Sequence, residues 1–169
     1  MDQDALATLQ APLKASYRDD PDAALVTLRA SGRLGEGMSC SLDTGRTLAE
    51  AGLHPAAGGD GSQLCSGDML LEALVACAGV TMRAVATSMG LDLRGGSVRA
   101  EGDLDFRGTL AVSKDAPVGF REIRLSFDVD TDATDAQLAA LTKLTERYCV
   151  VWQSLRRPPE GSVSVTRAG

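Results

Sequence analysis

One long apolar segment, residues 67–89, constrains the fold of this chain more than any other feature. It starts at Ser66-Gly67-Asp68, residues that can cap a helix, and it ends at Gly90. Between Met69 and Val85, apolar side chains occupy nearly every face of the predicted helix. Such a helix must be buried on most sides, so the remaining segments have to pack around it.

The segments around this helix predict strands and a second helix. We expect strands over residues 24–30, 38–42, 97–106, 120–129 and 162–166, a hairpin turn over residues 31–37, and a second helix over residues 134–147. The alternation is clearest where Ile123, Leu125 and Phe127 share one strand face. This order of elements is typical of an α+β fold with a mostly antiparallel sheet packed on the buried central helix. We expect residues 1–21 to form an N-terminal helix or arm and residues 22–169 to form a single domain.

Composition and charge argue against several classes of partner. The 169 residues suffice for one domain with a core, and the net charge of −6 argues against nucleic acid and anionic membranes as partners. The chain opens with acidic residues rather than an apolar signal segment. Its longest uncharged apolar run, residues 73–82, is shorter than the roughly 20 residues that span a bilayer. We therefore expect a cytoplasmic protein, in a compartment where thiols are kept reduced.

Four cysteines, at positions 40, 65, 77 and 149, are the residues most capable of chemistry. They form no Cys-x-x-Cys motif and no cluster with histidine, so a structural zinc site is not expected. The only histidine, His54, leaves little room for histidine-based catalysis. Cys77 lies in the middle of the apolar helix, and Cys149 follows the second helix. Because both helices must face a common core, these two thiols suggest dithiol redox chemistry, although either could simply be a small apolar filler.

Three segments resemble the OsmC/Ohr family, the osmotically inducible and organic-hydroperoxide-resistance proteins. Asp68-Met-Leu-Leu-Glu-Ala-Leu-Val-Ala-Cys77 is similar to the central-helix motif of that family. Gly32-Arg33-Leu-Gly35 is similar to a turn that carries arginine, and Cys149 with the residues after it resembles the second cysteine segment. The order of predicted elements agrees with the family over residues 22–167. Val150 is a departure, because family members often carry proline directly after the second cysteine.

The resemblance implies an OsmC-like fold, an intertwined homodimer, and a cysteine-dependent peroxidase that reduces organic hydroperoxides. Cys77 would attack the O–O bond and become a sulfenic acid. Cys149 would condense with it to a disulfide, which a dithiol reductant reopens. A disulfide requires the Cα atoms of the two cysteines to lie within about 7 Å. The thiols supply the electrons, so no cofactor and no metal is implied.

Cys77 needs a neighbour that helps it to ionise. It lies more than two turns beyond the start of its helix, where the helix dipole contributes little, and apolar neighbours raise the pKa of a thiol. We therefore expect a nearby cation, and Arg33 is the candidate because a guanidinium stays charged and can pair with a thiolate. Asp68 matches the helix-start glutamate of the family and is expected to hold Arg33 in place. Glu72 is an alternative partner, Asp68 could merely cap the helix, and either subunit of a dimer could supply Arg33.

Two other functions stay open on the sequence alone. The same fold could be a non-enzymatic module that binds an apolar ligand, or a redox sensor that uses Cys65 and Cys77. Cys65 precedes the central helix, where it could be exposed, and Cys40 is expected in a strand, facing the core. His54 is expected to be a loop residue that could line a pocket, rather than a catalytic base.

Overall fold

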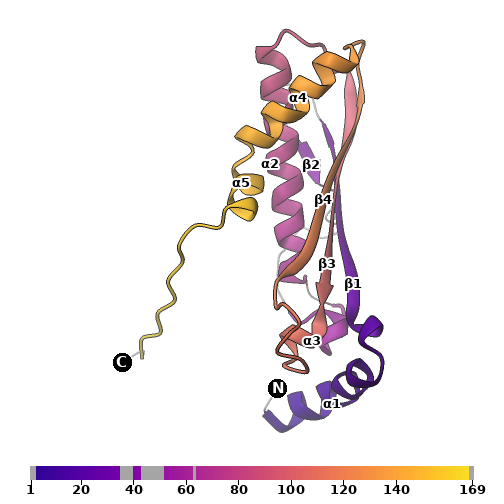
Figure 1. Cartoon of the computed structure of the whole chain (residues 1–169), viewed down its shortest axis with the longest axis vertical. Helices are drawn as coiled ribbons and strands as arrows, with labels where there is room; N and C mark the ends of the chain where they lie inside the picture. Colours follow the sequence, from indigo (N-terminus) through magenta and orange to yellow (C-terminus); the bar gives the residue numbers. More distant parts are fainter. Residues whose placement is uncertain (1–2, 35–39, 43–51, 63, 168–169) are drawn as a thin grey trace.

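The computed structural model describes the chain apart from residues 1–2, 35–39, 43–51, 63 and 168–169. In chain order its elements are α1 (Gln3–Asp19), the 3-10 helix η1 (Pro21–Ala24), β1 (Leu25–Leu34), β2 (Cys40–Leu42), the 3-10 helix η2 (Pro55–Ala57), α2 (Ser66–Ser88), β3 (Gly95–Asp105), α3 (Phe106–Thr109), β4 (Phe120–Asp130), α4 (Asp135–Tyr148) and α5 (Val150–Arg156). An antiparallel sheet packs against the long central helix α2, with α4 and α5 on the same side of the sheet as α2 (Figure 1). The expected α+β class is therefore confirmed.

The strands of the described residues form one sheet in the order β2-β1-β3-β4, with antiparallel neighbours throughout. The strands expected over residues 97–106 and 120–129 are confirmed as β3 and β4. The first strand is longer than expected, because residues 31–34, which we assigned to a hairpin turn, continue β1 and pair with β3 as far as Arg33 and Ser97. The rest of that turn, residues 35–37, lies outside the described residues, as do residues 38–39 of the second predicted strand.

The central helix packs on the sheet through one stripe of side chains. Its buried residues recur every three or four positions: Leu71, Leu74, Val75, Ala78, Gly79, Met82, Val85 and Ala86. All of them except Gly79 form one core with Val98 of β3 and Leu141 of α4. Gly102 of β3 lets the layers approach, because a Cβ atom there would lie 2.5 Å from Phe120 Cε1 and 3.3 Å from Leu71 Cδ2. This close packing holds the first turns of α2 against the sheet, and the buried stripe of the helix continues past Cys77.

The opposite face of α2 is open, which corrects the expectation of a helix buried on most sides. Leu70 is 37% exposed, Val80 is 39% exposed, and Ala73 between them is exposed as well. By length and composition alone α2 could cross a membrane, as could no other helix in the described part of the chain, but its buried stripe fits the core of a folded domain. A single chain covers one side of this apolar helix and leaves the other to solvent.

A second, smaller core lies at the end of the sheet where α1 packs. The Tyr17 hydroxyl donates to the Ala56 carbonyl oxygen at 2.7 Å and so ties α1 to η2. Tyr17 is buried there with Phe106 and Leu110. The predicted N-terminal helix is confirmed, and it contacts the body of the chain.

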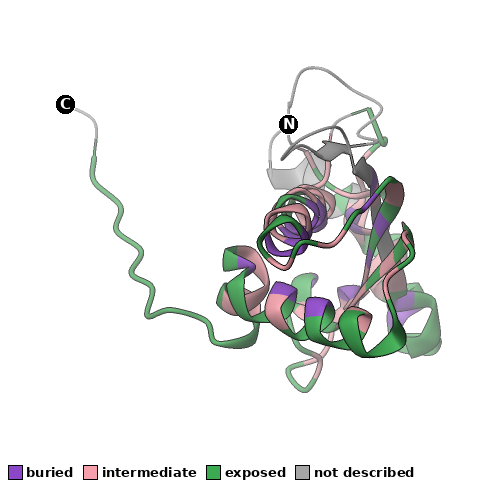
Figure 2. Ribbon diagram, turned by 90° about the horizontal axis from the view of Figure 1, so that it is seen from above, coloured by how far each residue is buried: buried purple, intermediate pink, exposed green. Residues whose placement is uncertain are grey.

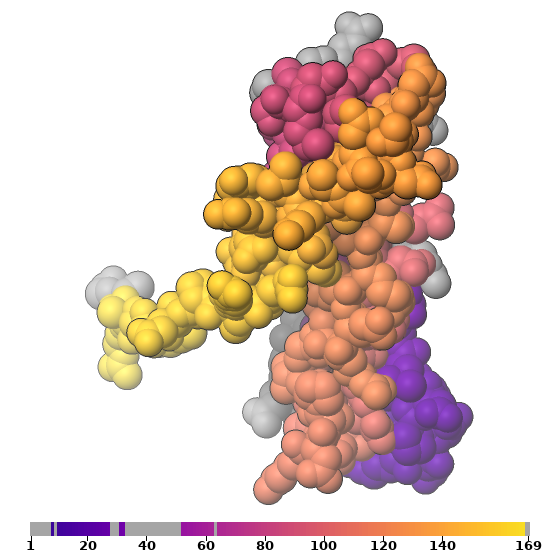
Figure 3. All heavy atoms as spheres, turned by 45° about the horizontal axis from the view of Figure 1, so that its top comes forward, coloured from indigo at the N-terminus to yellow at the C-terminus, as the bar shows by residue number. Residues whose placement is uncertain are grey.

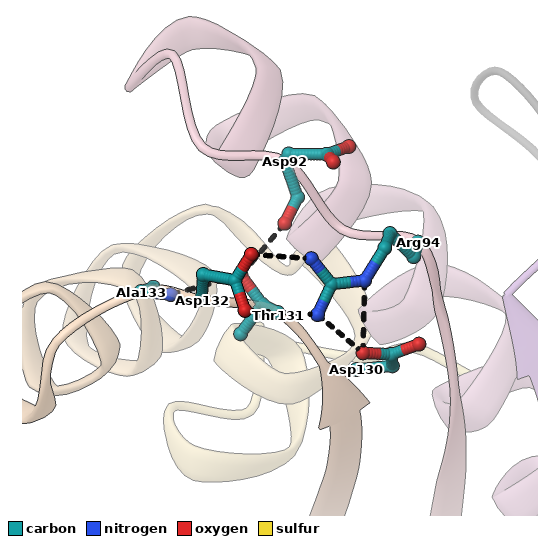
Figure 4. Close-up of polar contacts among 6 residues, drawn as sticks. All are labelled: Asp92, Arg94, Asp130, Thr131, Asp132 and Ala133. Atoms are coloured by element: carbon teal, nitrogen blue, oxygen red, sulfur yellow. Dashed lines mark hydrogen bonds and ion pairs between the residues drawn. The ribbon is translucent and has the colours of Figure 1, made fainter.

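Polar contacts fix the turn from which α4 departs (Figure 4). Arg94, just before β3, donates through Nε to Asp130 Oδ1 at 3.0 Å and pairs with Asp132 at 2.7 Å. These groups are largely exposed, so the pairs add little to stability, but they join the entry of β3 to the exit of β4. The predicted second helix then starts with a capping box, in which Thr134 and Gln137 each bond the other's backbone.

The prediction of a strand over residues 162–166 is wrong for the single chain, because these residues do not form a strand in it. Residues 158–167 form neither helix nor strand and are exposed throughout, as Figure 2 shows in green. Figure 3 shows this tail leaving the body of the molecule beyond α5. The alternation of Val163 and Val165 suits a strand, but a strand needs a neighbour to pair with, and the tail lies away from its own sheet.

Candidate active site

Cys149 sits at the break between α4 and α5, where it ends one helix and starts the next. Its N–H donates to the Thr145 carbonyl oxygen at 2.9 Å, and its own carbonyl oxygen accepts from the Gln153 N–H at 2.9 Å. Its backbone is extended, with φ −71° and ψ 107°, so the chain changes direction at this residue. The first N–H groups of α5 have no intrahelical partner and are free to donate elsewhere.

Cys77, on α2, lies beside this break between α4 and α5. The thiols of Cys77 and Cys149 lie near enough for each to shift the pKa of the other, and α2 packs against both α4 and α5. The two thiols that the sequence placed 72 positions apart (149 minus 77) therefore lie together. Cys149 is fully buried, whereas Cys77 is only partly buried, so of the two thiols Cys77 is the one that solvent can reach.

The surroundings of Cys77 favour its thiolate. Burial raises the pKa of Cys77, but hydrogen bonds from the Val151 N–H, the Cys149 thiol, the Thr81 hydroxyl and the Val150 N–H outweigh it, so the pKa lies below its usual value. All of these donors are uncharged. Among the described residues, the start of α5 and two neighbouring side chains thus favour the thiolate, and the contribution expected from a cation stays a prediction.

The pKa of Cys149 is shifted in the opposite direction, above its usual value. Burial raises the pKa of Cys149 to about 11, and the hydrogen bond to Cys77 and the charge of the Cys77 thiolate add to the rise. The N–H groups of Trp152 and Val151 oppose it in part. The pKa values of the two neighbouring thiols are therefore shifted in opposite directions, that of Cys77 downward and that of Cys149 upward.

The sequence reasoning missed α5 as a source of these donors. The segment has only seven residues and no capping side chain, so it carries no periodic signal. One signal was available: the family often has proline directly after the second cysteine, and proline is favoured at the first position of a helix. A proline at that position of the family pattern indicates that a helix begins directly after the second cysteine.

For Arg33 the structure describes only the position of the backbone. It lies near the end of β1, paired with Ser41 of β2 and Ser97 of β3, and its side chain lies outside the described part of the structure. The side chain of Cys40, which starts β2, lies outside that part too, although the expected strand is confirmed. The roles of Arg33 as cation and of Asp68 as its anchor stay predictions.

Asp68 lies at the other end of α2 from the thiol pair. It precedes Cys77 by nine residues, which is about 13 Å along a helix, and helical side chains lean toward the N-terminus, away from Cys77. Burial raises the pKa of Asp68, and His54 lowers it in part. Burial and the charge of Asp68 also raise the pKa of Glu72. Within one chain Asp68 thus neighbours His54 and Glu72 rather than Cys77.

A pocket of ≈ 340 Å³ opens beside the start of α2. Its walls are mainly apolar, and they include His54, whose ring stacks on Phe106 with centroids 5.0 Å apart and whose Nδ1 accepts from the Ala56 N–H at 3.0 Å. Cys65 lines the same pocket. It lies 12 residues before Cys77, about 18 Å along the helix, which is too far for a disulfide between Cys65 and Cys77 in one chain.

Fold and site together define an α+β protein with two neighbouring thiols, one of them on a central core helix. The model of the OsmC-like protein family matches residues 59–164, more than half of the chain, and the chain belongs to that family. Its fold is similar to an OsmC-like hydroperoxide resistance protein from Jannaschia sp. CCS1, with a TM-score of 0.61 and 15% identity over 85% of this chain and 95% of the other. It is also similar to an OsmC-like protein from Mycoplasma pneumoniae, with a TM-score of 0.56 and 15% identity over 79% and 86% of the two chains. No curated protein sequence matches this chain significantly.

Proposed function

We propose that this protein is a thiol-dependent peroxidase that reduces organic hydroperoxides through a Cys77 sulfenic acid and a Cys77–Cys149 disulfide. The observation that carries the proposal is the pair of neighbouring thiols, brought together where α2 packs on α4 and α5, whose pKa values are shifted in opposite directions. Membership of a family that includes hydroperoxide-resistance proteins supports it. A packing role alone gives no reason for a partly exposed thiol to accept several N–H and O–H donors.

The first step is an attack by the Cys77 thiolate on one oxygen of the hydroperoxide. An S–O bond forms, the O–O bond breaks, and the leaving alkoxide takes a proton from solvent to become an alcohol. Cys77 loses two electrons and becomes a sulfenic acid. The step needs a thiolate that solvent can reach, and Cys77 is the partly exposed member of the pair with the lowered pKa.

The second step follows from what oxidation does to Cys149. Once Cys77 is a neutral sulfenic acid, the thiolate charge and the hydrogen bond to it no longer raise the pKa of Cys149, while the Trp152 and Val151 N–H groups still favour its thiolate. Cys149 therefore becomes more acidic only after Cys77 has reacted. Its sulfur then attacks that of Cys77, the S–O bond breaks, the hydroxyl leaves as water, and an external dithiol reduces the new disulfide.

The surface around Cys77 favours apolar substrates over H₂O₂. Ala73 lies about one turn before Cys77 and Val80 about one turn after it, both exposed, and Val150 at the start of α5 is 70% exposed. An alkyl or aryl group that packs beside these side chains is removed from water, which favours binding. H₂O₂ has no apolar group and gains no such contribution. In this proposal Arg33 supplies the cation that holds the peroxide oxygens, and Asp68 anchors Arg33.

We further propose that the working unit is a homodimer. The open apolar face of α2, with Leu70, Ala73 and Val80, is a surface that a second copy could cover. The exposed tail supports the same idea, because its apolar side chains Val163 and Val165 are 96% and 94% exposed in the single chain. A dimer could also bring Asp68 of one chain near Cys77 of the other.

The deciding experiment compares cumene hydroperoxide with H₂O₂ under dithiothreitol. We expect consumption of cumene hydroperoxide to be at least about tenfold faster, a difference of roughly 1.4 kcal/mol in activation free energy. Cys77→Ser is expected to abolish turnover with an unchanged circular dichroism spectrum, and Cys65→Ser, the matched control in the same helix region, to retain it. A Cys77→Ser protein that still consumes the hydroperoxide would show that Cys77 is not the nucleophile.

The pocket at the start of α2 favours a second candidate, a non-enzymatic module for an apolar ligand. The pocket is mostly apolar, has His54 as a polar group in its wall, and lies away from the thiol pair. If this candidate is right, an apolar fluorescent probe should bind the wild type, and Leu70→Glu should abolish that binding. The wild type should also show no hydroperoxide turnover. Turnover that depends on Cys77 would decide against it.

A further inference from the structure

Thr81 lies one turn after Cys77 on α2 and contacts it twice. Its Oγ1 donates to the Cys77 carbonyl oxygen at 2.7 Å. The same hydroxyl lies near enough to the Cys77 sulfur to help lower the pKa of that thiol. Helical side chains lean toward the N-terminus, so the Thr81 side chain lies over the turn that carries Cys77. One hydroxyl thus reaches both a backbone oxygen and the sulfur.

A hydroxyl has a single proton to donate, so the two acceptors compete for it. The Cys77 carbonyl oxygen is also the i−4 acceptor for the helical N–H of Thr81, so it keeps a partner when the hydroxyl turns away. The sulfur needs a donor only when it is a thiolate, and hydrogen bonds to charged acceptors are the stronger ones. Turning the hydroxyl is a rotation about one bond and requires no movement of the helix.

We propose that Thr81 is a positioning residue for the reactive thiol: its hydroxyl donates to the Cys77 carbonyl oxygen while the thiol is protonated and turns to the sulfur when the thiolate forms. It thereby stabilises the thiolate and holds it in one rotamer. This inference rests on the proposed function only in that it takes Cys77 as the reactive thiol.

The same helix contains a matched control. Thr87 makes the same bond to the residue four positions before it, with Oγ1 donating to the Arg83 carbonyl oxygen at 2.9 Å. Thr87 is exposed and its i−4 residue carries no thiol. Removing either hydroxyl changes the helix alike, so any difference between the two variants belongs to the sulfur.

The test is the pH dependence of alkylation of Cys77 by iodoacetamide, in a Cys65→Ser background. That background is needed because no lysine or arginine separates residues 65 and 77, so one tryptic peptide would carry both cysteines. Thr81→Val is expected to move the midpoint up by about one pH unit, the size of one hydrogen bond to a charged group. Thr81→Ser should return the midpoint most of the way, and Thr87→Val should leave it unchanged. Thr81→Ala is expected to act like Thr81→Val, so the result does not depend on how well one variant folds.

An unchanged midpoint in Thr81→Val and Thr81→Ala, or an equal shift in Thr87→Val, would overturn the role of Thr81. This outcome is distinct from failure of the proposed function. A wild type that consumes no hydroperoxide but shows the shift in Thr81→Val would contradict the peroxidase and leave the role of Thr81 standing. A working peroxidase with no shift would remove Thr81 alone.

Discussion

Val150 follows Cys149 directly, where members of the family often carry proline. It is the first residue of α5, and its N–H is one of the donors that lower the pKa of Cys77. Proline has no N–H and could not make this contact. The departure from the family pattern therefore adds one donor that favours the Cys77 thiolate.

Replacing this valine tests the contribution of that donor. Val150→Pro should be tolerated by the backbone, because proline is favoured at the first helical position and the preceding residue, Cys149, is already extended. We expect the pKa of Cys77 to rise by about half a unit, the size of one weak backbone hydrogen bond. Val150→Ala, which keeps the N–H, should leave the pKa unchanged. The measurement is the alkylation profile of Cys77, and equal profiles for the two variants would contradict the assignment.

The sequence foresaw that two thiols would lie near each other. Cys77 and Cys149 each lie in an apolar context that points to a common core, and the structure brings them together, while their redox roles stay predictions. The basis of the thiolate was not foreseen, since it depends on the direction of two N–H groups at a helix break, and side-chain patterns carry no information on that direction. Asp68 is expected to hold Arg33 in place because it matches a motif, and this role stays a prediction, since Asp68 itself lies nine helical residues before Cys77.

At the scale of elements, long periodic segments were predictable and short ones were not. The expected helix over residues 134–147 agrees with α4 because it has both a stripe and a capping box. The seven-residue α5 and the four-residue α3 have too few positions to show a period. Tertiary contacts form these helices, and the break between α4 and α5 is what brings Cys149 to Cys77.

One polar group holds three strands together on the outer face of the sheet. Asp103 of β3 accepts from Thr27 of β1 at 2.5 Å and from Arg124 of β4 at 2.6 Å. The hydrogen bonds from Arg124 and Thr27 lower the pKa of Asp103 to about 2. A lowered carboxyl pKa stabilises the fold above the unfolded value, near pH 4, and this stability is lost as the pH falls through 2.

Asp103→Asn should therefore cost roughly 1 kcal/mol of unfolding free energy at neutral pH, as expected for a partly exposed network. The difference between wild type and variant should stay constant above about pH 5 and shrink between pH 4 and 2. Urea unfolding at several pH values measures it. Glu122→Gln, which removes a more exposed partner of Arg124, is the control and should show a much smaller effect. A difference independent of pH would mean that the Asp103 carboxylate contributes no charge-dependent stability.

At the scale of the whole molecule, α2 explains both the success and the limit of the sequence reading. Its apolar length predicted a central helix, and this was confirmed. Its apolar circumference predicted burial on most sides, but one chain covers a single stripe. The tail shows the same limit, because residues 162–166 have the pattern of a strand and no strand beside them. An apolar pattern in a sequence shows which side chains must be buried. The surface that buries them can belong to another chain.

The homodimer proposal makes a direct prediction at this scale. Val80→Glu places a charge on the open face of α2 and should convert a dimer into monomers, measured by light scattering during gel filtration. Val118→Glu, at an apolar residue that is 67% exposed in the loop before β4, is the control and should stay dimeric. If the wild type itself is monomeric, the proposed dimer is wrong.

The most direct test of the central claim is to map the disulfide formed after one equivalent of cumene hydroperoxide. Remaining thiols are alkylated, the protein is digested, and the peptides are identified by mass spectrometry. We predict a Cys77–Cys149 link within a single chain, which leaves a monomer band on a non-reducing gel, and in Cys149→Ser we predict a sulfenic acid at Cys77 that dimedone captures. A Cys65–Cys77 link, or a Cys77 that stays reduced while Cys149 is oxidised, would contradict the account.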